Sequence, residues 1–196
     1  MADTTIPCTY FGQPGKDNTA RVLQIARARA EQLGIRSIVV ASTTGQTGVR
    51  AAEVFVGYNL VVVTHSAGFQ ESNYQELTEE NHLAIESRGG RILTCMHAFG
   101  GVGRAVRKKL QTYELEEIMA YTLRIFGEGM KVACEISLMA ADAGLIRTGE
   151  PTVAIAGSGR GADTAIVLTA ANAQAFFEMK VMEVLCKPGF YTSPGS

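Results

Sequence analysis

The segment from Ser42 to Gly48 has the residue types of an anion site. It reads STTGQTG and joins an apolar run to a helical pattern. A loop that opens a helix offers unpaired backbone N–H groups, and the helix dipole favours an anion there by about 0.3–1 kcal/mol. Several hydroxyls could each donate to a separate oxygen, which suits phosphate better than carboxylate. The alternative to an anion site is a capped helix preceded by a glycine turn. The predicted contacts are Ser42, Thr43, Thr44, Gly45, Gln46 and Thr47.

A second glycine-rich segment, Gly157 to Thr164, follows the apolar run at 152–156. Its three glycines within five positions allow a ligand to approach the backbone closely. Arg160 could pair with a phosphate or carboxylate, and Asp163 could accept from a ribose-like hydroxyl or cap the next segment. The G-x-G-x-G order lacks the long helix and the later acidic residue of a dinucleotide-binding fingerprint. Both a ligand site and a simple turn therefore remain open here.

Two histidines, His65 and His97, follow predicted strands at the same edge of the sheet. Each could hydrogen-bond a ligand, act as a general acid or base near neutral pH, or tie down a loop. Gly68 lies close to His65. Gly101 beside His97 would either let a flat ring approach the backbone or only permit a tight turn. Cys95 adds a C-x-H spacing, but without a second pair of ligands this does not support a metal site.

Catalytic machinery is not visible in the sequence. There is no nucleophile elbow, no Walker lysine motif and no pair of acids with suitable spacing. Glu114, Glu116 and Glu117 gather in the first turn of a predicted helix, where compensation of the helix dipole explains them. The catalytic residues, if there are any, stay unassigned.

The elements that must position these residues alternate between strand and helix patterns. Runs rich in β-branched residues predict strands at 6–11, 37–41, 59–64, 91–95, 152–156 and 180–186, with a further apolar run at 164–168. Apolar residues at helical spacing predict helices that end at Gly34 and that cover 48–56, 78–88, 114–126, 130–143 and 170–177. This order predicts an α/β fold of three layers, a mainly parallel sheet with helices on both faces. Ligands bind such sheets beyond the carboxyl ends of the strands, where the four loops discussed above would meet.

Composition supports a single packed domain. The chain has 196 residues, of which 46% are hydrophobic and 19% charged. We expect one α/β domain over 1–187 and a loose C-terminal tail at 188–196, because no linker or internal repeat interrupts the pattern. The four cysteines are dispersed, which is typical of buried free thiols in a reducing compartment.

The charge balance argues against nucleic acid and membrane partners. The 18 basic and 19 acidic residues give a net charge of -1, so no overall field attracts polyanions. The basic run from Arg104 to Lys109 lacks interleaved aromatic residues and fits a solvated helix face. No apolar stretch approaches the roughly 20 residues that span a bilayer, and the N-terminus lacks the order of a signal peptide. A cytoplasmic protein is expected.

A family resemblance adds to these inferences. The region from Ala20 to Phe69, with SIVVASTTGQTGVRAAEVF and NLVVVTHSAGF, resembles the C-terminal α/β domain of pyruvate kinase. In those enzymes the matching loop holds a phosphate of a sugar-phosphate effector, and the positions that carry over are Ser42, Thr43, Thr44, Gly45 and Thr47. The catalytic barrel of pyruvate kinase has no counterpart here, so the resemblance does not imply its phosphoryl-transfer activity.

Nearly the full length also resembles a stand-alone prokaryotic family with this fold, through YFGQPGKDNT, HAFGGVGR, EISLMAADAGLI and GRGADTAIVLTAAN. That resemblance implies flavin mononucleotide (FMN) as the ligand, with its phosphate on Ser42 to Thr47 and other strand-end loops near the ring. It implies no particular activity.

We therefore expect a protein that binds a small phosphorylated molecule, with FMN or another phosphate-bearing metabolite as the ligand. A flavin-dependent enzyme that uses His65 or His97 is one alternative, and an oligomeric scaffold with an incidental anion site is another. The apolar residues of the paired helices at 114–143 would suit a homo-oligomer, although packing in the core explains them equally well.

Overall fold

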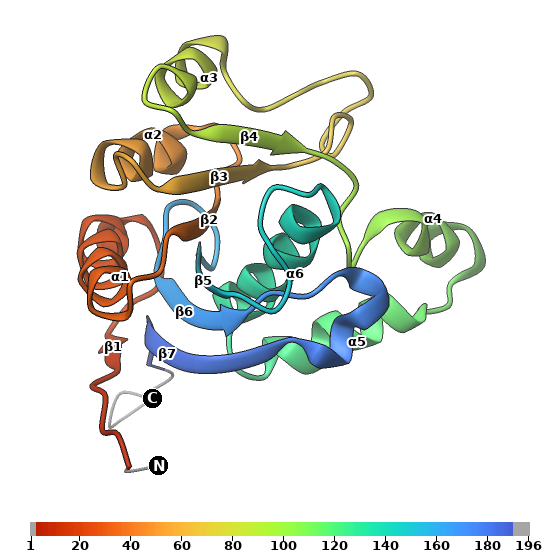
Figure 1. Ribbon diagram of the computed structural model, residues 1–196. Coiled ribbons are helices and arrows are strands. Elements are labelled where there is room, and N and C mark those ends of the chain that lie inside the picture. The colour runs from red at the N-terminus through yellow and green to blue at the C-terminus, as the bar shows by residue number, and fades with distance from the viewer. Residues whose placement is uncertain (1–2, 190–196) are drawn as a thin grey trace.

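A computed structural model describes residues 3–189 and contains one seven-stranded sheet (Figure 1). Its strands are β1 (Thr9–Phe11), β2 (Ser37–Ala41), β3 (Asn59–Thr64), β4 (Arg91–Thr94), β5 (Pro151–Ala156), β6 (Thr164–Thr169) and β7 (Lys180–Pro188). The order across the sheet is β1-β7-β6-β5-β2-β3-β4. Neighbouring strands pair in parallel except β6, which is antiparallel to both β5 and β7. The mainly parallel sheet predicted from the sequence is confirmed.

Helices cover both faces of the sheet, as the alternating pattern predicts (Figure 1). The helical segments are η1 (Lys16–Asn18), α1 (Thr19–Leu33), α2 (Gln46–Val54), α3 (Glu79–Glu86), α4 (Gly101–Leu110), α5 (Leu115–Arg124), α6 (Glu128–Asp142) and η2 (Ala173–Glu178). On one face, α1, α2 and α3 pack against side chains such as Ile38 and Val40. On the other face, α5 and α6 pack against Val39 and Val61. Consecutive residues of β2 thus enter opposite cores, so this strand is apolar without alternation.

Glycine and local spacing set the ends of the main helices. In α1, Val22, Ala26 and Ala30 are fully buried at helical spacing. The helix ends at Gly34, whose φ of 66° lets its N–H donate to the carbonyls of the last turn. Gly127, with φ 127°, separates α5 from α6 at the predicted glycine break.

Helix α2 begins two residues earlier than the sequence pattern predicts. It covers Gln46–Val54 rather than 48–56, so Thr47 lies in its first turn. Gly45 makes this early start feasible because its φ of 94° turns the chain directly into the helix. The hydroxyl-rich segment is therefore partly the helix terminus itself.

The C-terminal strand is longer than predicted. β7 extends to Pro188, because β1 pairs with its end and aligns Phe11 with Pro188. Gly189 donates its backbone N–H to the Phe11 carbonyl at 2.8 Å. Residues 188 and 189, assigned above to a loose tail, are therefore held at the sheet edge, and 190–196 lie outside the described residues. In the part of the chain that is described, no helix combines the length and apolarity needed to cross a membrane.

Candidate functional site

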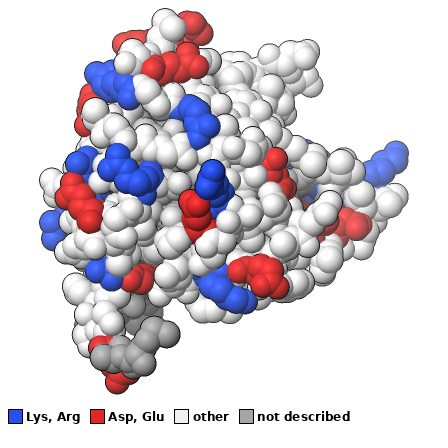
Figure 2. All heavy atoms as spheres, in the orientation of Figure 1, with Lys and Arg blue, Asp and Glu red and all other residues white. Residues whose placement is uncertain are grey.

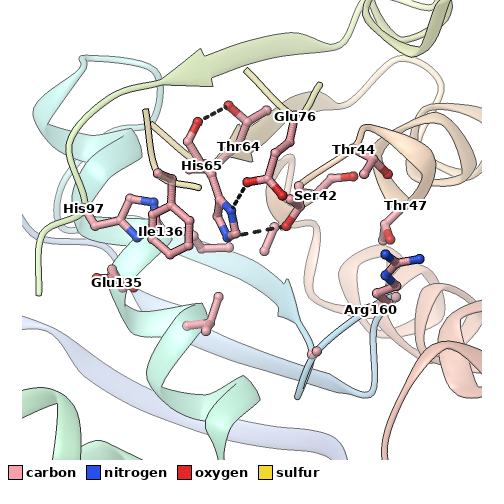
Figure 3. A pocket seen from close by; sticks show the side chains of 18 of the residues that line it. Ser42, Thr44, Thr47, Thr64, His65, Glu76, His97, Glu135, Ile136 and Arg160 are labelled. Atoms are coloured by element: carbon pink, nitrogen blue, oxygen red, sulfur yellow. Dashed lines mark hydrogen bonds and ion pairs between the residues drawn. The ribbon is translucent and has the colours of Figure 1, made fainter. Parts of the chain in front are cut away.

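A cavity of about 580 Å³ lies beyond the carboxyl ends of β2, β3 and β5. The chain runs from β2 to β3 and β4 on one side, whereas β5 lies on the other side of β2. Strand order therefore reverses between β2 and β5, and at such a point the loops leave the sheet in opposite directions and open a crevice. The volume is within the range of ordinary ligand pockets. The loops after β2 and β5, singled out separately in the sequence, face each other across this cavity (Figure 3).

One end of the cavity gathers hydrogen-bond donors. Within residues 3–189, no hydrogen bond occupies the backbone amides of residues 43–47, which precede and open α2. Thr44 and Thr47 line the cavity with hydroxyls that have no partner in the same described chain. Arg160 reaches from the β5 loop toward Thr47 (Figure 3). Amides, hydroxyls and a guanidinium, all of them groups that can donate to an anion, thus converge at this end of the cavity.

Two residues of the predicted loop serve the loop itself. The Ser42 hydroxyl is buried and accepts from the Gly48 N–H at 3.0 Å. Gly45 does not line the cavity, and a Cβ there would lie 2.5 Å from the Cβ of Asn81. Asn81 also donates to the Thr44 carbonyl at 2.8 Å, which fixes the turn. Ser42 thus supplies the acceptor for one first-turn amide of α2, although the N-cap position itself is Gly45.

The loop after β5 divides into a cavity wall and an internal anchor. Arg160 lines the cavity together with glycines on either side of it. Asp163, in contrast, is fully buried and does not reach the cavity. Its carboxylate accepts from the N–H groups of Gly15 and Ser158 at 2.9 and 3.0 Å and from the Thr164 hydroxyl at 2.8 Å. The predicted contact of Asp163 with a ribose is corrected: these bonds use its oxygens to hold the loop.

His65 is held in one orientation at the mouth of β3. Its Nδ1 lies 2.7 Å from a carboxylate oxygen of Glu76, and its Nε2 lies 3.4 Å from the Thr43 hydroxyl. Donation from Nδ1–H to Glu76 leaves Nε2 as an acceptor, so this ring can accept a hydrogen bond from the Thr43 hydroxyl or from a ligand atom in the same place. The sequence did not point to Glu76, because it lies 11 positions from His65 in a segment without periodicity.

The other end of the cavity is aromatic. The ring of Phe69 stacks on His97 with centroids 5.0 Å apart and planes 18° apart, and His65 lies 4.0 Å from Phe69. Burial lowers the pKa of His97 to about 4, against the opposing effect of the nearby Glu135 carboxylate. His97 is therefore neutral at neutral pH. Its Nε2 is buried and has no hydrogen-bond partner within the described residues, so a polar ligand atom would find a free group there.

A buried ion pair forms part of the cavity wall. Lys131 and Glu135 on α6 contact each other, and each side chain is only 4% exposed. Glu135 also accepts a hydrogen bond from the Phe99 N–H at 2.9 Å. Its buried carboxylate therefore has both an ion-pair partner and a hydrogen-bond donor. The sequence interpretation of this helix as an apolar core helix missed the pair. Opposite charges four residues apart on an otherwise buried helix were the available signal.

The cations around the cavity are not all paired with carboxylates. Four cations face three carboxylates in its lining: Arg104, Arg124, Lys131 and Arg160 against Glu76, Glu128 and Glu135. The carboxylates already contact His65, Arg124 and Lys131. Arg104 and Arg160 therefore have no carboxylate partner among the described residues. Elsewhere, basic and acidic side chains are mixed on the face seen in Figure 2, without a broad field of one sign.

Gly68 and Gly101 do not line this cavity. They border a separate shallow depression on the far side of Phe69 and His97. A Cβ at Gly101 would lie 2.5 Å from the Met96 sulfur, so this glycine accommodates a side chain rather than a flat ring. The described residues contain no group of three His, Cys, Asp or Glu side chains arranged for a metal ion.

A match to a protein family agrees with this architecture. The profile of the family "Pyruvate kinase, alpha/beta domain" matches residues 20–168. Among solved structures, a pyruvate kinase from Cryptosporidium parvum aligns with 13% sequence identity and a TM-score of 0.40. The alignment covers 77% of this chain and 22% of that enzyme, so the chain spans only about a fifth of its length. The family match extends over most of the chain, from α1 to β6, and the chain belongs to the family of the pyruvate kinase α/β domain.

Proposed function

We propose that this protein binds a phosphorylated small molecule in the cavity at the β2 and β5 loops. The observation that carries the proposal is the convergence of free donors at one end: the unoccupied amides of residues 43, 44, 46 and 47, the hydroxyls of Thr44 and Thr47, and Arg160. Each hydrogen bond to a charged phosphate would contribute about 1.5–3 kcal/mol. A neutral ligand would leave Arg160 without a counter-charge.

The ligand that we propose is FMN, because it carries a phosphate for one end of the cavity and a flat ring for the other. Its phosphate would occupy the α2 terminus, and its flat ring would lie toward Phe69, His65 and His97. Aromatic side chains suit a planar heteroaromatic ring, and the orphaned Nε2 of the neutral His97 offers it a hydrogen bond. When bound, this cofactor would supply electron and hydride transfer.

A flavin-dependent enzyme is the second candidate, and the Glu76–His65 pair favours it. A carboxylate that orients an imidazole toward a ligand cavity is a common arrangement for proton transfer. In this role, Nε2 of His65 would hold or release a proton at an atom of the bound molecule, while Glu76 keeps Nδ1–H in place. An oligomeric scaffold with an incidental anion site would not need the Glu76–His65 pair.

Mass spectrometry of the small molecule released by denaturing freshly purified protein tests the proposal. We expect FMN or another phosphorylated compound in near-stoichiometric yield. Equilibrium titrations with FMN, riboflavin and inorganic phosphate then separate the two ends of the cavity. Protein that releases nothing and binds neither FMN nor phosphate would leave only the scaffold alternative. Reduction of bound flavin by NADH or NADPH, lost in His65→Asn, would favour the enzyme.

We also propose a cytoplasmic location. The cysteines Cys8, Cys95, Cys134 and Cys186 are all free. Burial raises the pKa of Cys134 to about 11 and that of Cys186 to about 12, so both remain thiols at neutral pH. Free thiols of this kind persist in a reducing compartment. Mass spectrometry after alkylation of freshly lysed cells would detect disulfides that contradict this location.

A further inference from the structure

Helix α5 is apolar on two sides. Its inner side contributes Ala120, Met119 and Leu123 to the core beneath the sheet. Its outer side carries large apolar side chains that are each more than half exposed: Leu115, Ile118, Tyr121 and Ile125. A surface helix normally has a polar outer face, whereas a helix that is apolar all round is buried. The outer side of α5 therefore has the composition of a covered surface.

The apolar surface continues into the turns at both ends of α5. Together the exposed apolar side chains form what we call the α5 surface: Leu110, Tyr113, Leu115, Ile118, Tyr121, Ile125 and Phe126. Tyr113 and Tyr121 contact each other edge to face at 5.8 Å, which joins the turn to the helix. At least half of each of these seven side chains is exposed. At about 100 Å² of exposed area for each side chain, the α5 surface amounts to about 700 Å². That exceeds the 300–600 Å² of the largest patch on an ordinary monomer and approaches the roughly 800 Å² that each partner contributes to a stable complex.

We propose that a second copy of this chain covers the α5 surface, with the two α5 helices packed antiparallel about a two-fold axis. A two-fold contact requires a surface that is complementary to itself. The apolar stripe meets this condition at its centre. At its ends, the first turn of α5 carries the exposed Glu116 and the last turn carries Arg124, which also contacts Glu128 of the same chain. Antiparallel packing brings the acidic turn of each helix to the basic turn of the other.

The charges at the helix start disfavour a membrane as the occupant. Helices that lie on anionic lipid have a polar face rich in Lys and Arg. Glu114 and Glu116 stand at the start of α5, whereas Arg107, Lys108 and Lys109 lie in the last turn of α4 beside Leu110. The charges around the α5 surface are therefore mixed and do not form the uniformly basic face that anionic lipid favours.

The α5 surface borders the ligand cavity without forming its anion end. Arg124 lines the cavity, and its guanidinium lies 5.1 Å from the ring centroid of Tyr121. Thr47 and Arg160 come from other elements, α2 and the loop after β5. Self-association is therefore tested independently of ligand binding, and either proposal can fail alone.

Sedimentation equilibrium of the full-length protein over a range of concentrations tests the proposal. We expect wild type to have the mass of two 20.9 kDa chains and Ile118→Glu with Ile125→Glu to have the mass of one. The matched control is Val56→Glu with Leu83→Glu, whose side chains are 63% and 57% exposed away from α5. The control should keep the wild-type mass, because it adds the same charge to apolar positions outside the α5 surface.

Leu115→Ser with Tyr121→Ser serves as a milder pair, and far-UV circular dichroism verifies folding of every variant. A wild-type mass above two chains that both α5 variants reduce by half or more also supports the proposal. Wild type with the mass of one chain at every concentration overturns it. It is overturned equally if the folded α5 variants keep the wild-type mass, or if only vesicles or another protein cover the surface.

Discussion

Replacing Thr44 and Thr47 together by alanine should weaken ligand binding while leaving the fold intact. Both hydroxyls line the cavity and have no partner in the described chain, so their removal breaks no internal hydrogen bond. Water can replace part of each lost contact with phosphate, so we expect a combined loss of about 1–3 kcal/mol. At about 1.4 kcal/mol per factor of ten, the Kd should rise roughly 5-fold to 150-fold.

Isothermal titration calorimetry with FMN and with inorganic phosphate, at one fixed ionic strength, measures this change. A matched control is Thr148→Ala with Thr169→Ala, since both threonines lie at the opposite edge of the sheet, before β5 and at the end of β6. Urea unfolding of the ligand-free Thr44→Ala and Thr47→Ala double variant should agree with wild type within about 0.5 kcal/mol.

An unchanged Kd for both ligands would refute the assignment of the phosphate to the α2 terminus. A loss confined to FMN, with phosphate affinity preserved, would place the hydroxyls elsewhere on the ligand. Equal losses for both ligands are the expected result, because the two threonines would contact only the group that FMN and phosphate share.

Three further predictions follow from the local contacts. Ser42→Ala should reduce the stability of the ligand-free protein by about 0.5–2 kcal/mol in urea unfolding, because the Gly48 N–H loses its acceptor. The lowered pKa of His97 means that the unfolded chain binds a proton between about pH 6.5 and pH 4 while the folded chain does not. The free energy of unfolding should therefore decrease as the pH is lowered from about 6.5 to about 4. His97→Gln should flatten this part of the pH profile of unfolding. Gly161→Ala should lower both the melting temperature and phosphate affinity, because φ is 77° and a Cβ would strike neighbouring backbone, which displaces the loop of Arg160.

The sequence predicted the sheet, the two helical layers and the hydroxyl-rich loop because these depend on local patterns. The run SIVVA of β2 is buried on both faces, as β-branched residues without alternation indicate. Gly34 ends α1 by its own backbone conformation. The start of α2 was less predictable, because the capping interaction joins Ser42 to a residue six positions ahead.

Which residues come together in the candidate site depends on the order of the strands in the sheet. Arg160 faces Thr47 only because β5 lies beside β2, although more than a hundred residues separate the two in sequence. Asp163 illustrates the opposite outcome: its residue type suits a ligand contact, but burial and three internal hydrogen bonds assign it to the loop. Glu76 became a partner of His65 through the path of an irregular loop.

The sequence by itself therefore determined which segments form strands and helices and which strand end is rich in donors for an anion. Tertiary structure alone decided which charges meet, which are buried, and which remain free for a ligand. The physical reason is that hydrophobic periodicity is encoded within a few residues, whereas electrostatic pairing and desolvation depend on the distance between groups that only the folded chain brings together.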